Sequence, residues 1–268
     1  MSTLVENVAK VTAAHAALKT AIASKGVAVP DGTKLTGMPA LVKQISTESV
    51  PTNPRAVFAG DDATSVVVPK TMVVDMTSLK NLALAFYQCQ SMTTLELPDG
   101  FGRNAVSIGG CFAICNALTS LKLPEGFGQN AETMAQGFIG CFQNCNTLTT
   151  LVLPDGFGQK AESLVNCFGY CNGLVSVHLP TGFGRNSTSN RNCFYDCSKL
   201  VDITGNPNFK TAIVLSYSPN LTHDSLMVVI NGLQTVTSSQ ALTLGSTNLA
   251  KLTDAEKKVA TDKGWTLA

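Results

Sequence analysis

Nine cysteines are the residues of this chain whose type and spacing could most readily do chemistry. Eight of them form four Cys-Phe-x-x-Cys pairs, and the ninth, Cys89, stands one repeat earlier, where Ala85 takes the first position. A zinc site in each pair would need further cysteine or histidine ligands, and none accompanies the pairs. Sulfurs at this spacing point in parallel and are poorly placed to bridge each other. We therefore predict that the cysteines are buried as small apolar residues.

Two other patterns could carry chemistry, and each has a plainer explanation. The three histidines, His15, His178 and His223, fall on separate predicted elements, which argues against a metal cluster or a catalytic triad. The segment from Gly100 to Ala105 formally matches the dinucleotide fingerprint Gly-x-Gly-x-x-Ala. It follows a proline turn, whereas a true fingerprint joins a strand to a long helix. We predict no catalytic residue and no cofactor.

An acidic column could bind calcium. Asp99, Glu125 and Asp155 occupy equivalent positions, and carboxylates stacked in this way can hold Ca²⁺. Thr181 breaks the column, and an acidic residue before glycine is also typical of a turn. We predict a turn role and no metal site, and leave calcium binding as the alternative.

The cysteines belong to a motif that recurs along the middle of the chain. Leu-Pro-x-Gly-Phe-Gly starts at Leu97, Leu123, Leu153 and Leu179, and so recurs after 26, 30 and 26 residues. Self-similarity of this period predicts a solenoid, in which each coil buries its apolar face against its neighbours.

Each repeat also predicts its own local structure. Leu-x-x-Leu-x-Leu indicates a short strand with one buried face, with strands expected at Leu95, Leu121, Leu151 and Val177. Proline ends the strand, acidic-Gly makes a turn, and the phenylalanine of Gly-Phe-Gly enters the core. We expect Cys-Phe-x-x-Cys to form a short helix, and the four extra residues within 132–140 to add about one helical turn.

The sequence pattern Phe-x-x-Cys-x-x-Leu-x-x-Leu-x-Leu-Pro resembles leucine-rich repeats of the BspA-like bacterial surface type, over roughly 64–207. The resemblance implies an α/β solenoid of about 26-residue coils. The pattern from Leu252 to Trp265 resembles the closing unit of the same family. In that unit we expect strands at 212–216, 241–244 and 263–267, and helices at 224–233, capped by Thr222 or Ser225, and 254–262.

The first 25 residues predict an amphipathic helix with a heptad pattern. After Met1, the a and d positions are Leu4, Val8, Val11, His15, Leu18 and Ile22. Such a short helix must pack on something. It either lies on its own chain or self-associates, with a trimer favoured and His15 fixing the register.

Residues 18–45 resemble the N-terminal segment of many phage fibre and appendage proteins, where it joins a fibre to the virion. The Pro- and Ser/Thr-rich stretch that follows is the best candidate linker. We predict an attachment and oligomerisation segment at 1–47, a linker at 48–63, the leucine-rich-repeat solenoid at 64–207 and a capping unit at 208–268.

Composition excludes several classes of function. A net charge of +1 and 14% charged residues argue against nucleic-acid binding. No apolar stretch is long enough for membrane insertion, and the N-terminus lacks the pattern of a secretory signal, so we expect synthesis in the cytosol.

The positions that vary between repeats point to a recognition surface. Outward strand positions and the middle of the Cys-Phe-x-x-Cys turn differ most, as on the binding faces of solenoids; neutral drift of solvated residues is the alternative. The candidate receptor face consists of Glu96, Lys122, Val152, His178, Tyr87, Tyr170 and Tyr195.

These observations together predict a non-enzymatic protein. The two resemblances favour a phage virion fibre or a tail or head appendage. Its N-terminal segment would bind other virion proteins, and its repeats would contact a glycan or protein receptor on the host surface. The alternatives are a bacterial cell-surface adhesin and a cytosolic scaffold.

Overall fold

The computed structural model describes residues 65–67 and 80–268. The chain divides into two units, 1–51 and 52–268, and all described residues belong to the second. The predicted heptad (Leu4, Val8, Val11, His15, Leu18 and Ile22), the fibre-like segment and the linker therefore lie outside the described residues.

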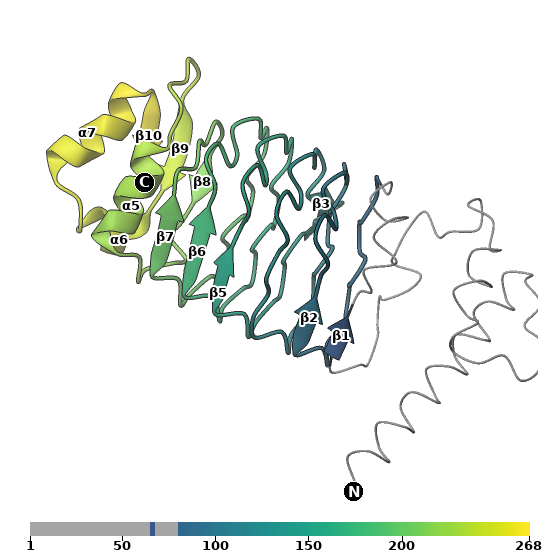
Figure 1. Ribbon diagram of the computed structural model, residues 1–268. Helices are drawn as coiled ribbons and strands as arrows, with labels where there is room; N and C mark the ends of the chain where they lie inside the picture. The colour runs from purple at the N-terminus through teal and green to yellow at the C-terminus, as the bar shows by residue number, and fades with distance from the viewer. Residues whose placement is uncertain (1–64, 68–79) are drawn as a thin grey trace, which may run out of the picture. The chain divides into compact units, whose positions relative to one another are not determined.

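The described residues form coils stacked on one another, with parallel strands aligned along one side (Figure 1). Near the start of the stack, β1 (Ser65–Val67) pairs with β2 (Thr94–Glu96). Further along, β5 (Thr150–Val152), β6 (Ser176–Leu179) and β7 (Asp202–Gly205) form one sheet. This confirms the predicted solenoid.

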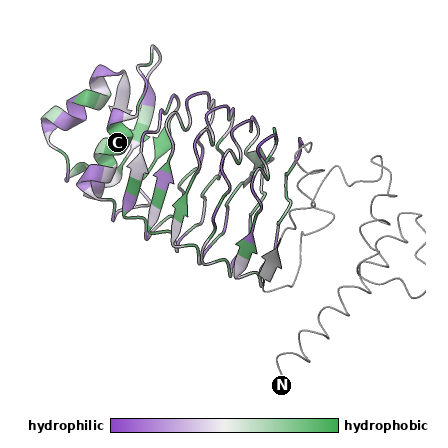
Figure 2. Ribbon diagram, viewed as in Figure 1, coloured by the Kyte–Doolittle hydropathy of each residue, from purple (hydrophilic) through white to green (hydrophobic). Residues whose placement is uncertain are grey.

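The strands alternate buried and exposed residues as the leucine pattern predicts. Leu95, Leu151 and Val177 are buried at the centres of their strands, and apolar residues are interspersed with hydrophilic ones along β6 and β7 (Figure 2). Leu121 is buried too, but its segment makes no strand ladder, contrary to prediction.

The Cys-Phe-x-x-Cys segments form turns, and the predicted short helix is wrong. Around Cys111–Cys115 two residues have positive φ, Gly110 at 64° and Ile114 at 63°. The amide of Ala113 donates within its coil to the Gly110 carbonyl at 3.1 Å, and that of Ile114 donates to Gln143 in the next coil at 2.8 Å. The backbone therefore satisfies its hydrogen bonds partly between coils, where an α-helix would satisfy them all internally.

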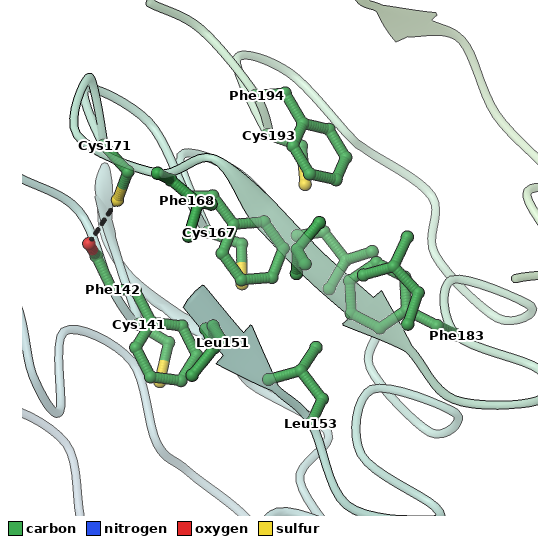
Figure 3. Close-up of a cluster of buried hydrophobic side chains, with 14 of the residues drawn as sticks. Cys141, Phe142, Leu151, Leu153, Cys167, Phe168, Cys171, Phe183, Cys193 and Phe194 are labelled. Atoms are coloured by element: carbon green, nitrogen blue, oxygen red, sulfur yellow. Dashed lines mark hydrogen bonds between the residues drawn. The ribbon is translucent and has the colours of Figure 1, made fainter. Parts of the chain in front are cut away.

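Two columns of stacked phenylalanines fill the interior. Rings from Cys-Phe and from Gly-Phe-Gly, extended by Phe86 at one end and Phe209 at the other, follow one another with centroids 5.1–6.4 Å apart. All of these pairs are stacked except Phe183–Phe209, which meets edge-on. Every ring in both columns is buried. The columns are Phe86, Phe112, Phe142, Phe168 and Phe194, and Phe101, Phe127, Phe157, Phe183 and Phe209. Leucines and cysteines pack around these rings (Figure 3).

The four extra residues of the long repeat form a hairpin, and the predicted helical turn is wrong. Strands β3 (Ala135–Gln136) and β4 (Ile139–Gly140) pair antiparallel across a two-residue loop, Gly137-Phe138. Gly137 has a φ of 63°, as a two-residue hairpin loop with glycine first requires. Gly109 and Gly140 lie so close to backbone of neighbouring coils that a Cβ atom would not fit.

The C-terminal unit closes the stack with a second parallel sheet and three helices. The sheet has the order β10-β9-β8. The elements are β8 (Ile213–Val214), α5 (His223–Asn231), β9 (Gln240–Thr243), α6 (Gly245–Leu249), α7 (Asp254–Asp262) and β10 (Trp265–Leu267). The predicted strands and both predicted helices are confirmed, and α6 was missed. Thr222 caps α5. Gly264, with a φ of 87°, follows the C-terminal end of α7 and turns the chain toward β10.

Candidate recognition surface

The nine cysteines are free thiols, and all of them are buried. The thiol of Cys171 donates to the Phe142 carbonyl of the preceding coil, with Sγ and O 3.0 Å apart (Figure 3). Cys115, Cys145 and Cys197 repeat this bond. Burial raises the pKa of Cys171 to about 12, so its thiol stays protonated at neutral pH. Because only the thiolate is a good nucleophile or metal ligand, these residues serve packing.

The other candidate chemical groups are also dispersed. Asp99, Glu125 and Asp155 lie exposed in successive turns. His178 contacts Thr204, with Nδ1 and Oγ1 3.1 Å apart. Within residues 65–67 and 80–268 there is no group of three or more His, Cys, Asp or Glu that could hold a metal ion.

The glycines of the dinucleotide-like motif have a packing role. The second glycine of each Gly-Phe-Gly has positive φ and lies against the phenylalanine ring of the next coil. At Gly128 an added Cβ would lie 2.7 Å from Cδ2 of Phe157. A buried contact with a ring leaves this turn no room for a pyrophosphate.

The outward strand positions form only a partial column. The register pairs Val152 with His178 and His178 with Thr204 across β5, β6 and β7, which brings these side chains to one face. Val152 is 61% exposed and His178 is half-buried. Glu96 belongs to a different ladder, on β2, and the segment of Lys122 lies between the two ladders.

The tyrosines of the candidate face come from two different positions of the Cys-Phe-x-x-Cys turn. Tyr87 and Tyr195 stand two residues before the second cysteine of their repeats, whereas Tyr170 stands directly before it. Hydrogen bonds between coils confirm the offset, because the Tyr170 amide donates to the Tyr195 carbonyl at 2.6 Å.

Three tyrosines nevertheless meet on the surface. The ring of Tyr195 lies 5.1 Å from that of Tyr170 and 4.4 Å from that of Tyr217, measured between centroids. The three rings come from successive coils and form an exposed tyrosine ridge (Tyr170, Tyr195 and Tyr217). Tyr170 is 37% exposed and Tyr217 is 47% exposed. Tyr87, in an earlier coil, is not part of this ridge.

Sequence reasoning missed Tyr217 because the repeat pattern fades before it. The signal was present one residue later, since Ser218 takes the place of the second cysteine. Its hydroxyl donates to the Cys197 carbonyl at 3.1 Å, and the Leu221 amide bonds back to it as Leu200 does to Cys197. With Ser218 aligned in this way, Tyr217 falls at the same position as Tyr170.

The electrostatics of the ridge favour the neutral form of Tyr195. Tyr217 and Tyr170, in that order, and then the smaller effects of burial and Asp196 raise the pKa of Tyr195. Its hydroxyl therefore stays protonated and can both donate and accept hydrogen bonds.

Stacked coils with an aligned parallel ladder, a leucine, phenylalanine and cysteine interior and a variable exterior define a leucine-rich-repeat solenoid. The chain belongs to the BspA type leucine rich repeat family, which matches residues 54–132 and 83–216. No curated protein matches the chain.

Among solved structures, the chain is similar to a leucine-rich repeat protein from Bacteroides ovatus ATCC 8483. The two are 19% identical with a TM-score of 0.35, and the match covers 70% of this chain and 51% of the other. The chain thus spans about half the length of that protein. Within the part of the chain that the structure describes, no helix has the length and apolarity needed to cross a membrane.

Proposed function

We propose that this protein is a non-enzymatic recognition protein that attaches its carrier, the cell or virion that displays it, to a surface. The observation that carries the proposal is the tyrosine ridge, three aromatic side chains in contact at the surface of a stack whose two phenylalanine columns are buried. Tyrosine is enriched where proteins recognise partners, because its ring is large, rigid and amphipathic. A rigid stack of coils supports such a surface without ordering it on binding.

The side chains that could suggest catalysis have packing or turn roles instead. The cysteine thiols are protonated and buried, and the glycine motif packs on phenylalanine rings. These contacts support a binding role over an enzymatic one.

Two carriers are candidates, each with its own support. A bacterial cell carrying an adhesin-type protein is compatible with the BspA type family. A phage virion is favoured by the fibre-like wording of residues 18–45, with the repeats contacting the host surface. On a virion, residues 1–45 would attach the protein to other virion proteins, and the heptad would assemble it as a trimer.

Binding of the labelled full-length protein to intact bacterial cells tests the recognition function. We expect saturable binding that is lost in a Tyr195→Ala/Tyr217→Ala double variant and kept in Tyr87→Ala, a matched loss of tyrosine outside the ridge. Binding that is unchanged by the double variant would remove the ridge from the function.

The mass of the full-length protein in solution tests the assembly. We expect a trimer, and a monomer when Val8 and Val11 are both replaced by Asp, because two charges in each heptad seam cannot be buried. A wild-type monomer would refute the trimer. Detection of the protein in purified virions would select the virion carrier, and detection on intact producing cells would select the adhesin.

A further inference from the structure

We propose that the tyrosine ridge (Tyr170, Tyr195 and Tyr217) binds an uncharged oligosaccharide lying along the stack from one coil to the next. This inference rests on the proposed recognition function and adds the chemical class of the ligand. Four properties of the ridge support it: its packing, its area, its charge and the backbone beneath it.

The packing of the rings decides where a ligand can lie. Centroid distances of 5.1 and 4.4 Å, with the rings tilted at 66° and 56°, put the three side chains in direct contact. No space remains for a cation enclosed between rings or for a flat base inserted between them. A ligand must therefore lie across the outer ring atoms and hydroxyl groups.

The area of the ridge fits a short oligosaccharide better than a protein. A fully buried aromatic side chain covers about 150–250 Å². Tyr170 and Tyr217 expose 37% and 47% of their surface, and Tyr195 is half-buried. The three rings together then offer only roughly 250 Å². A stable protein interface needs about 800 Å² on each partner.

The charge of the ridge disfavours an anionic ligand. Tyr217 and Tyr170 first, and then burial and the Asp196 carboxylate beside Tyr195, raise the pKa of Tyr195. A phosphorylated, sulfated or uronic-acid glycan would be repelled by this carboxylate. A neutral sugar presents apolar C–H faces and hydroxyl groups side by side, which complement the ring edges and phenol hydroxyls.

The backbone holds the ridge in place before any ligand arrives. The Tyr170 amide bonds to the Tyr195 carbonyl, and buried thiols or hydroxyls bond to neighbouring coils at Cys171 and Ser218. Tyr170 itself has a φ of 63°, the left-handed region that suits asparagine, as at Asn144 in the same position. Ile114 shares this conformation at the same position, so the repeat turn itself fixes where the Tyr170 ring leaves the backbone.

Titration of the full-length protein by saturation-transfer NMR tests the inference. The probes are the neutral hexasaccharides of maltose, cellulose and mannan types, with hexagalacturonic acid as the charged arm. We expect at least one neutral probe to bind and to receive saturation from the protein. Tyr195→Ala should weaken its binding about tenfold or more. Tyr87→Ala should leave the affinity unchanged.

A second variant separates binding from folding. Tyr170→Asn copies Asn144 and relieves the left-handed tyrosine, so we expect it to be at least as stable as wild type but to bind about tenfold more weakly. Circular dichroism checks its fold.

The inference is overturned if no neutral probe binds, if the ridge variants bind as wild type does, or if the charged probe binds more tightly than the neutral ones. Binding to intact cells that depends on the ridge, without binding of any neutral probe, would leave the recognition function standing and refute only the oligosaccharide. Loss of both would refute the two together.

Discussion

The contact between Gly128 and the ring of Phe157 yields a sharp prediction about what holds adjacent coils together. An alanine at position 128 would place its Cβ 2.7 Å from Cδ2 of that ring and 3.1 Å from Cδ1 of Ile108. Phe157 and Ile108 are both fully buried, so neither side chain can move without disturbing the core. Gly128 also has a φ of 68°, which disfavours any side chain.

Gly126 provides the matched control in the same turn. Its φ is 76°, and an added Cβ would meet Nε of Arg103 at 3.0 Å and Oε1 of Gln129 at 3.1 Å. These atoms belong to long polar side chains that can swing away. Alanine at position 126 therefore keeps the backbone cost and largely avoids the steric one.

The two costs can be separated in magnitude. A left-handed residue with a Cβ costs about 1–2 kcal/mol, and overpacking a well-filled core costs about 1–3 kcal/mol. We expect Gly126→Ala to lower the free energy of unfolding by ~1–2 kcal/mol and Gly128→Ala by ~2–5 kcal/mol. Native domains have only about 5–15 kcal/mol in total.

Urea unfolding followed by circular dichroism and by Trp265 fluorescence measures both variants. The m-values must also be compared, because solenoid coils can unfold separately. A double-mutant cycle with Phe157→Leu isolates the ring contact: the cost of Gly128→Ala should fall by ~1–3 kcal/mol in that background. Equal costs at positions 126 and 128, or no coupling to Phe157, would refute the argument.

Three further predictions concern the core and the cap. The ring of Phe168 lies between two others, with centroids 5.7 and 5.1 Å away. Phe168→Ala should lower the free energy of unfolding by ~3–5 kcal/mol, and should give a lower m-value or a second transition in urea, because neighbouring coils lose their shared contact. A single transition of unchanged slope would contradict this. Native protein should resist a thiol reagent at neutral pH and expose all nine cysteines in urea, and fast native labelling would show that the thiols are not buried. The His223–Glu256 ion pair joins α5 to α7, with Nε2 and Oε1 2.8 Å apart. It raises the pKa of His223 above its ordinary 6.5, mainly through the hydrogen bond to Glu256. Backbone and side-chain hydrogen bonds from Thr253 and the bond from His223 lower the pKa of Glu256 below 4.5. The contribution of the pair to stability is therefore complete between about pH 4.5 and 6.5. It is lost as pH rises through the folded pKa of His223 and as pH falls through that of Glu256, and His223→Gln should abolish the alkaline loss in thermal melts across pH.

The spacing of Leu, Phe and Cys in the sequence was sufficient to predict the stack, because each of these residues marks a buried position that recurs once per coil. The turns could not be predicted from spacing alone. Cysteines four residues apart fit one face of a helix, but the amide of Ile114 bonds to the next coil, and local periodicity carries no information about such bonds. The hairpin could have been predicted, since Gly137 opens a two-residue loop between short apolar segments.

The candidate site was predicted only in part. Tyr170 and Tyr195 do meet on the surface, whereas Tyr87 lies apart from them. Tyr170 and Tyr195 occupy different positions in their repeats, and the offset lets a ring from one coil lie between rings from its neighbours. Tyr217 was missed because a serine replaces the cysteine that marks the repeat elsewhere.

The thiol-to-carbonyl bonds between coils have a consequence for the environments in which the fold can persist. Many proteins exposed at surfaces depend on disulfides, and they weaken when those bonds are reduced. Here neighbouring coils are joined by protonated sulfur atoms that neither need an oxidant to form their bonds nor offer a reductant anything to break. The repeat stack should therefore fold equally well with or without dithiothreitol, so that redox conditions place no restriction on its assembly.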